Sequence, residues 1–246
     1  MMLWMSSSSP RVDEGAGLIL TMLKPFASGP SRDRPHLTHP GWRESTPQVT
    51  LPAGGSLRLR PLRRADYQAW SALRIRDEHH LRPVEPTVPG SWRDAHSKIS
   101  WWDTSGYLLR AARRGTVLPL VIELDGRFVG QLTIGNIQHG GVSDAWIGYW
   151  VYSGVTGRGV ATAACALGVD HAFRRVGLHR LTATYLPSNP ASGRVLALSG
   201  FREEGYFIRN LHIDGRWMDH HFVALLADEY PSTAVARLRQ AGRLRP

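Results

Sequence analysis

A glycine-rich turn between an apolar strand and an alanine-rich helix is the part of the sequence best suited to chemistry. Gly154, Gly157 and Gly159 lie within six residues, and Arg158 adds a positive charge beside them. Glycine permits tight turns, so several backbone N–H groups can converge on one point, and the following helix adds unpaired N-terminal donors. This segment therefore predicts a site for a phosphate-containing ligand.

Two common phosphate-binding loops are excluded by the residues around these glycines. No Gly-Lys-Ser or Gly-Lys-Thr follows, as a P-loop requires, and the dinucleotide-binding order G-x-G-x-x-G fails at Thr162. A different diphosphate is therefore expected.

Three segments downstream carry further motifs: N-P-A-S from Asn189, L-S-G-F-R-E-E-G from Leu198 and D-G-R-W-M-D-H from Asp214. They look like the N-x-x-S, L-G-F-x-x-E-G and D-G-x-W-x-D-H motifs of the RimJ/RimL branch of the GNAT (GCN5-related N-acetyltransferase) superfamily. The resemblance runs in family order from about residue 57 to about residue 228.

The glycine turn is similar to the pyrophosphate loop of the same superfamily, R/Q-x-x-G-x-G/A. The match is at Gly159 and Ala161, whereas Thr156 stands where a long polar side chain is usual. One side-chain contact to phosphate is therefore in question, but the backbone donors remain.

The resemblance implies an α/β GNAT fold, with a mixed central sheet that is splayed at the acetyl-CoA site and flanked by helices. It implies acetyl-CoA as the acetyl donor, a primary amine as the acceptor, and a backbone N–H that holds the oxyanion. The expected cofactor-binding residues are Trp150, Val151, Thr156, Gly157, Arg158, Gly159, Val160, Ala161, Thr162 and Asn189.

The resemblance also indicates where the catalytic acid and base are expected. In much of the superfamily, a tyrosine at the position of Leu196 acts as the catalytic acid. Ser192, one helical turn earlier, is therefore the candidate acid here. The alternative is that Ser192 is an ordinary helix residue without a catalytic role. Leu211 replaces a glutamate that some RimL-like members use. Asp144 is therefore the candidate base, with an exposed strand-end aspartate as the alternative.

A weak base favours one class of acceptor. An α-amine with a pKa of about 7.7–8.0 is already on the order of 10% neutral at pH 7, whereas lysine, at ~10.4, is below about 0.1% neutral. We therefore expect an N-terminal α-amine rather than a lysine.

These residues must be positioned by a series of strands and helices. The expected elements are a strand at 56–62, helices from Asp66 and Ser91, strands at 117–124, 128–137 and 143–152, a helix at 159–175, a strand at 181–185, a helix at 189–200 and two strands flanking Asp214-Gly215. Asp125-Gly126 predicts a hairpin turn. Gly148 is expected to mark a bulge that splays its strand.

Residues 1–52 are rich in Ser, Pro, Gly and Arg and show no sustained period. We expect them to form a flexible, dispensable extension, part of which is a start-site artefact if translation begins at Met5 or Met22. Residues 53–246 are expected to form one GNAT domain.

The composition narrows the class of protein further. The net charge is +10, and only two of the basic residues are lysines, so arginine supplies most of the positive charge. A codon bias toward arginine explains this excess, and no nucleic-acid partner is needed to account for it. The single cysteine, Cys165, excludes an internal disulfide and is expected to pack in the core of a cytoplasmic protein. His220 and His221 diverge on a strand, so no metal is predicted, and no apolar run is long enough to span a membrane.

Three functions remain open from the sequence. The first is N-acetylation of a protein N-terminus, by resemblance that of a ribosomal protein, through direct attack in a ternary complex. The second is acetylation of a small amine such as an antibiotic or a polyamine. The third is a non-catalytic acyl-CoA sensor. A monomer or a homodimer fits all three.

Overall fold

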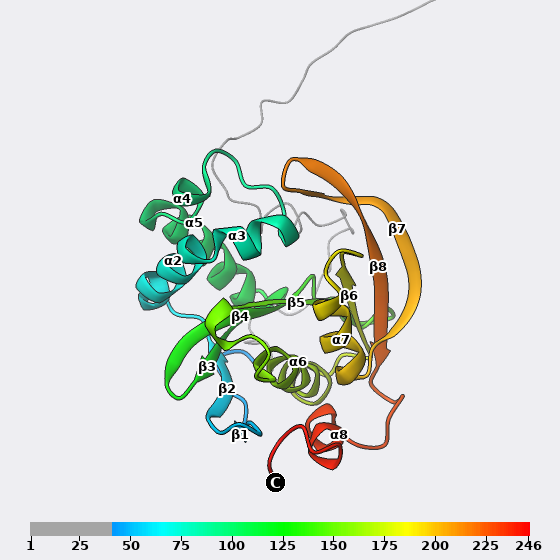
Figure 1. Cartoon of the computed structure of the whole chain (residues 1–246). Coiled ribbons are helices and arrows are strands. Elements are labelled where there is room, and N and C mark those ends of the chain that lie inside the picture. Colours follow the sequence, from blue (N-terminus) through cyan, green and yellow to red (C-terminus); the bar gives the residue numbers. More distant parts are fainter. Residues whose placement is uncertain (1–40) are drawn as a thin grey trace, which may run out of the picture.

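Alternating apolar positions build one mixed sheet of eight strands in the order β1-β2-β3-β4-β5-β6-β8-β7 (Figure 1). The computed structural model describes residues 41–246. The strands are β1 Val49–Thr50, β2 Ser56–Pro61, β3 Val117–Leu124, β4 Arg127–Gly135, β5 Asp144–Val151, β6 Arg180–Tyr185, β7 Arg202–Ile213 and β8 Arg216–Leu226. Only β5 and β6 are parallel neighbours among these strands. The predicted mixed sheet is confirmed.

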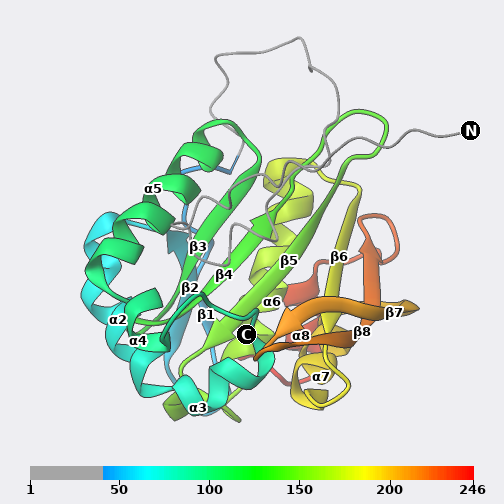
Figure 2. The same ribbon diagram turned by 90° about the horizontal axis from the view of Figure 1, so that it is seen from above.

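Helices cover both faces of the sheet (Figure 2). The segments between β2 and β3 are η1 Arg64–Asp66, α2 Tyr67–Arg76, α3 Glu78–Leu81, η2 Arg82–Val84, α4 Trp92–Ala95 and α5 Lys98–Arg113. The later segments are η3 Ser153–Val155, α6 Val160–His171, the π-helical turn η4 Ala172–Val176, α7 Pro190–Ser199 and α8 Ala234–Gln240. We call the two sides the α2–α5 face and the α6–α7 face.

Each face of the sheet has its own core. On the α6–α7 face, Cys165 is fully buried in the core, as predicted. Burial raises the pKa of its thiol to about 12, so the thiol stays protonated. On the other face, Trp70 of α2 and Trp101 of α5 pack together, and Trp146 and Trp150 of β5 border them. Alternate residues of β5 therefore serve opposite faces.

The sheet opens between β5 and β6. These strands are paired from Asp144↔Arg180 to Trp146↔Thr182 and then separate. On the other side, β4 and β5 stay paired without a register shift, so the bulge predicted at Gly148 is wrong. Gly148 instead makes room for an indole, because an added Cβ would lie 3.3 Å from the Trp146 ring.

The long β7–β8 hairpin curves over the α2–α5 face, and its tip is tied to the connector between η2 and α4 (Figure 1). Pro86 forms a β-bridge with Ile213, and the Thr87 N–H donates to the His212 carbonyl over 2.8 Å. The η2–α4 connector and the hairpin tip, which are far apart in the chain, are therefore held side by side.

Residues 41–52 belong to the folded domain, which corrects the predicted boundary at residue 53. Trp42 and Leu51 are buried in the larger core, and β1 pairs with β2. The Thr46 hydroxyl oxygen accepts the Leu59 N–H over 2.9 Å. A few isolated apolar residues without a period are enough to anchor this segment, because each one enters a core built by other elements.

The remaining differences concern element ends. The helix expected from Ser91 stops at α4, and Ser97 caps the separate helix α5. The predicted helix at 159–175 ends as α6 plus the π-helical turn η4. The prediction for residues 1–40 lies outside the described residues. Within residues 41–246, no helix has the length and apolarity needed to cross a membrane.

Candidate active site

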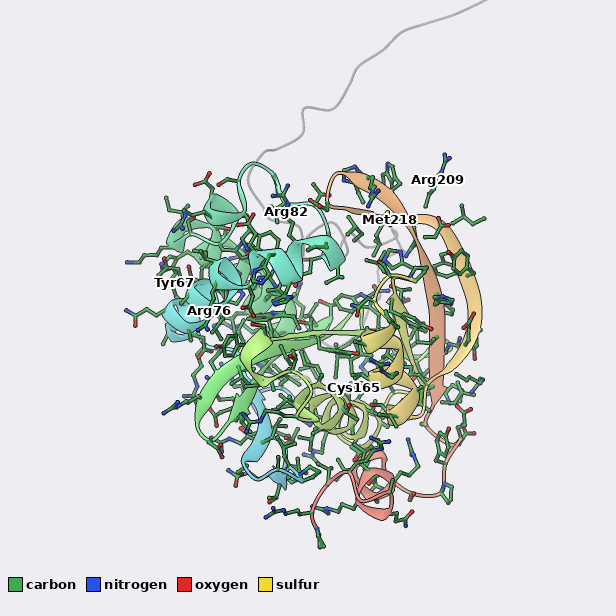
Figure 3. All side chains as sticks on the ribbon, in the orientation of Figure 1. Tyr67, Arg76, Arg82, Cys165, Arg209 and Met218 are labelled. Atoms are coloured by element: carbon green, nitrogen blue, oxygen red, sulfur yellow. The ribbon has the colours of Figure 1, made fainter. Side chains whose placement is uncertain are left out.

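A cavity of about 1040 Å³ lies where β5 and β6 separate. Its walls come from both faces of the sheet: the glycine turn and α7 on one side, and α2, the η2–α4 connector and the β7–β8 hairpin on the other. In Figure 3, Cys165 marks the α6 layer and Met218 marks the hairpin. Residues on both faces of the sheet can therefore contact one molecule bound in this cavity.

The glycine turn presents backbone donors to this cavity. Gly157 and Gly159 have φ of 73° and 81°, a left-handed conformation that favours glycine. The first hydrogen bond of α6 joins the Ala163 N–H to the Gly159 carbonyl. The N–H groups of the three residues between them therefore form no hydrogen bond within the helix and can donate to a ligand. These residues, which also line the cavity, are Val160, Ala161 and Thr162.

The two polar side chains of the turn behave differently from the expectation. Thr156 donates its hydroxyl to the Ser153 carbonyl over 2.8 Å, so it stabilises the turn itself. Arg158 is exposed and does not line the cavity. Arg158 is therefore outside the cavity wall, the donors that the turn directs into the cavity are backbone N–H groups, and the predicted contact of Arg158 with the cofactor stays a prediction.

The edge of β5 offers a further N–H to the opening. The Tyr152 N–H donates to the Val129 carbonyl, which belongs to β4. Since consecutive strand residues direct their N–H groups to opposite edges, Trp150 also points toward β4, whereas Val151 points toward the gap. Trp150 and Val151 are both predicted cofactor-binding residues, and of the two only Val151 directs its backbone N–H toward the opening, where it can donate to an oxyanion.

Ser192 lines the cavity, and its hydroxyl lies 3.2 Å from the Tyr149 hydroxyl. Asn189 caps α7, because its side-chain oxygen accepts the Ser192 N–H. Burial raises the pKa of Tyr149 above its ordinary value, so this phenol stays protonated. Sequence reasoning missed Tyr149, although alternation along its strand places it on the face opposite Trp150.

Asp144 does not share this site, which corrects its assignment as the candidate base. It lies at the other end of β5, where that strand is still paired with β6 opposite Arg180, and it does not line the cavity. From Asp144 to Trp150 the strand extends by roughly 20 Å. Burial raises the pKa of the Asp144 carboxyl, with Arg180 opposing the shift, but no cavity group among the described residues can use it.

The α2–α5 side of the cavity carries a charged cluster that the sequence did not reveal. Arg74 forms a two-pronged ion pair with Glu85, and its Nε donates to His96 Nε2 over 2.9 Å. Burial and the neighbouring guanidinium lower the pKa of His96 to about 3, so this imidazole is neutral. Arg74 also lies over the Trp150 ring. Glu85 is the only carboxylate among the described residues that line the cavity.

The family model described as "Acetyltransferase (GNAT) domain" matches residues 56–202. The chain belongs to the GNAT acetyltransferase family. It is an N-acetyltransferase, and acetyl-CoA is its acetyl donor.

Relatives of this GNAT acetyltransferase include solved structures and curated proteins. Mycobacterium smegmatis RimJ in complex with CoA-disulfide is 51% identical, with a TM-score of 0.82 over 84% of this chain and 98% of that chain. The ribosomal protein uS5-alanine N-acetyltransferase of Escherichia coli (strain K12) is 28% identical over 77% of this chain and 97% of its own length. The probable N-acetyltransferase YjcK of Bacillus subtilis (strain 168) is 39% identical, but the match covers only 42% of this chain and 56% of that protein.

Replacing Gly159 tests the turn of this GNAT acetyltransferase. Gly159→Ala should weaken acetyl-CoA binding by about tenfold or more, because the left-handed conformation costs roughly 1–2 kcal/mol with a side chain and the methyl group obstructs phosphate approach. Gly126→Ala is the matched control, since Gly126 also has a positive φ and open space but lies in the β3–β4 turn. Equal affinities of the two variants by calorimetry would contradict this role of the turn.

Asp77 is expected to position the same turn. Its buried carboxylate accepts the Ser153 N–H over 2.6 Å and the Ser153 hydroxyl over 2.8 Å, which joins the α2–α3 junction to η3. Asp77→Asn should raise KM for acetyl-CoA several-fold with a smaller change in kcat, because the turn loses a fixed anchor. Asp66→Asn, at a buried aspartate paired with Arg60, should lower stability without this KM effect.

Proposed function

We propose that this GNAT acetyltransferase transfers the acetyl group of acetyl-CoA to the N-terminal α-amine of a protein, and that a ribosomal protein is its substrate. The observation that carries this proposal is the cavity between β5 and β6. It runs from the glycine turn on one face to the part lined by α2, the η2–α4 connector and the β7–β8 hairpin on the other, which we call the acceptor chamber. Donor and acceptor can therefore meet in one ternary complex.

The described residues support a direct attack. The α6 N-terminus and the glycine turn bind the pyrophosphate, and the exposed β5 edge receives the arm that carries the thioester. The amine attacks the thioester carbon from the α2–α5 face, and the Val151 N–H stabilises the oxyanion. When the carbon–sulfur bond breaks, Ser192 on the α6–α7 face protonates the thiolate.

Pairing between Tyr149 and Ser192 suits this step. A phenol with a raised pKa keeps its proton; the Tyr149 hydroxyl donates to the Ser192 carbonyl over 3.4 Å and lies 3.2 Å from the Ser192 hydroxyl, which it holds at the cavity wall. Ser192 can then donate to a sulfur anion without an ionised neighbour that would oppose the charge.

The choice of a protein N-terminus rests on two supports. The Escherichia coli relative, named for the alanine of ribosomal protein uS5, matches over nearly its whole length. The acceptor chamber also has its single carboxylate among the described residues engaged by Arg74, so it offers little free negative charge to a polyamine. An α-amine needs less help from a base than a lysine does.

A substrate panel tests the proposal. Thiol release from acetyl-CoA would be measured with peptides that have a free N-terminal alanine, the same peptides with a blocked N-terminus and an internal lysine, and polyamines or aminoglycosides. We expect turnover only with free N-termini, and mass spectrometry should place the acetyl group there. Turnover with small amines alone would favour the second function, and binding without any turnover would favour a sensor.

A further inference from the structure

We propose that His220 is the general base that takes the proton from the attacking amine. This inference rests on the proposed function and adds the group that the loss of Asp144 leaves missing. His220 lies on β8, is 3% exposed and lines the same cavity as Ser192.

The two adjacent histidines of β8 face opposite sides of the sheet. His221 pairs with Tyr185 of β6 and stacks on its ring, with 4.8 Å between the ring centroids. The Tyr185 ring lies against Gly193 of α7, so His221 is on the α6–α7 face. Because side chains alternate along a strand, His220 points to the α2–α5 face, where the acceptor amine enters.

The strand register places His220 level with the reaction centre. Thr184 pairs with Phe222, so the next position along β6 on the same face, Leu186, lies opposite His220. On the other side of β6, extending the Trp146↔Thr182 register brings Trp150 level with the same position. Two spacings between paired strands are about 10 Å, and since β5 and β6 are no longer paired at this level, the backbones of β5 and β8 lie farther apart than that. The separation of β5 and β6 leaves room between these side chains for an amine, or for an amine and one water.

One nitrogen of His220 is free to act as a base. Nδ1 lies 3.0 Å from the Met218 carbonyl, and since a carbonyl only accepts, Nδ1 carries the proton. Nε2 therefore holds the lone pair, and no described residue forms a hydrogen bond with it. Figure 3 labels Met218 on the β7–β8 hairpin.

The surroundings keep His220 neutral at physiological pH. Burial lowers its pKa below the ordinary value of 6.5, against the opposing influence of Met218 and Asp219. The other titratable groups on this side of the cavity are Arg74, His80, Glu85 and His96. Arg74 and Glu85 compensate each other, and His96 is neutral, so the chamber adds little net charge beside the imidazole.

The proton balance of the step is complete. Attack forms the carbon–nitrogen bond and leaves a positive, strongly acidic nitrogen, whose proton passes to His220 Nε2. The carbon–sulfur bond then breaks, and the thiolate takes a proton from Ser192. The imidazolium returns its proton to solvent before the next turnover, and the serine oxygen is reprotonated from solvent in the same interval. A base of low pKa is adequate, because it acts on the acidic nitrogen of the intermediate rather than on a free ammonium.

His220→Asn is the decisive variant. The asparagine amide lies where Nδ1 was and can still donate to Met218, but nothing replaces Nε2. We expect kcat/KM with an N-terminal alanine peptide to fall by about 10²-fold or more at pH 7, with unchanged acetyl-CoA affinity. The acidic limb of the wild-type pH profile should combine protonation of the substrate amine with protonation of a second group whose pKa lies below 6.5, and this second protonation should be absent in the variant.

Two comparisons keep the inference falsifiable. His221→Asn, on the opposite face, should keep its rate and its acidic limb. His220→Gln removes the Nδ1 donor as well as the base, so any further loss relative to His220→Asn measures the structural role, and near-wild-type activity of His220→Asn with loss in His220→Gln would overturn the inference. A wild type that acetylates no amine would overturn the proposed function and this inference together, whereas a peptide-active His220→Asn overturns the inference alone.

Discussion

A chain that begins at Ala53 should lose its cooperative thermal transition, whereas a chain that begins at Gly41 should keep it. Removing residues 41–52 takes Trp42, Val49 and Leu51 out of the larger core and removes β1 from the sheet. A large-to-small change at one such site costs about 2–5 kcal/mol, and a whole domain is stable by only about 5–15 kcal/mol. Thermal and denaturant unfolding of the two chains would measure the difference.

A single substitution separates packing from chain length. Trp42→Ala should destabilise the domain by about 3–5 kcal/mol, the usual range for a buried tryptophan. Exposed Trp217 on β8 provides the control, and Trp217→Ala should change stability by much less. Coincident melting of the chains beginning at Gly41 and Ala53 would show that this segment adds nothing to the fold.

Ser192→Ala should lower kcat by about 10²-fold or more, the usual effect of losing a general acid, with little change in acetyl-CoA affinity. The reason is that the thiolate then leaves without a proton donor at the α7 wall. Single-turnover measurements with an N-terminal alanine peptide would isolate the chemical step.

Two further variants locate the effect of Ser192. Tyr149→Phe should cause a smaller loss, since it removes only the partner that orients the serine. Ser199→Ala, on the same helix but bonded to the Val195 carbonyl and away from the cavity, should leave kcat unchanged. A near-native kcat for Ser192→Ala would assign the proton to water or to Tyr149.

Local chemistry in the sequence predicts the fold and the conformation of the glycine turn well. The glycine turn, the Asn189 cap and the Asp125-Gly126 hairpin turn depend on residues that are adjacent in the chain, so their types and spacing are enough. The resemblance to GNAT proteins added the order of the elements and the opening between the parallel strands.

The acceptor side depends on contacts between distant segments, which no local pattern encodes. Glu85 lies in a proline-rich connector without any period, and only the fold brings it to Arg74. The prediction of Asp144 as the base is wrong because Asp144 lies at the paired end of β5 and not at the opening. The point where β5 and β6 separate is set by their pairing, which the sequence of β5 alone does not encode. The sequence does not single out Tyr149, because apolar and aromatic residues on both faces of its strand predict that both faces are buried.

The tie between the hairpin tip and Thr87 has a consequence for how a substrate arrives. Together with the paired strands and α2, it completes a continuous circuit of backbone around the acceptor chamber. Under the proposed function, a polypeptide should therefore reach the cavity with its terminus first, because a terminus can pass through a closed ring as a single extended strand. Under the proposed function, an extended terminus should therefore be acetylated faster than the same terminus packed in a folded protein or an assembly.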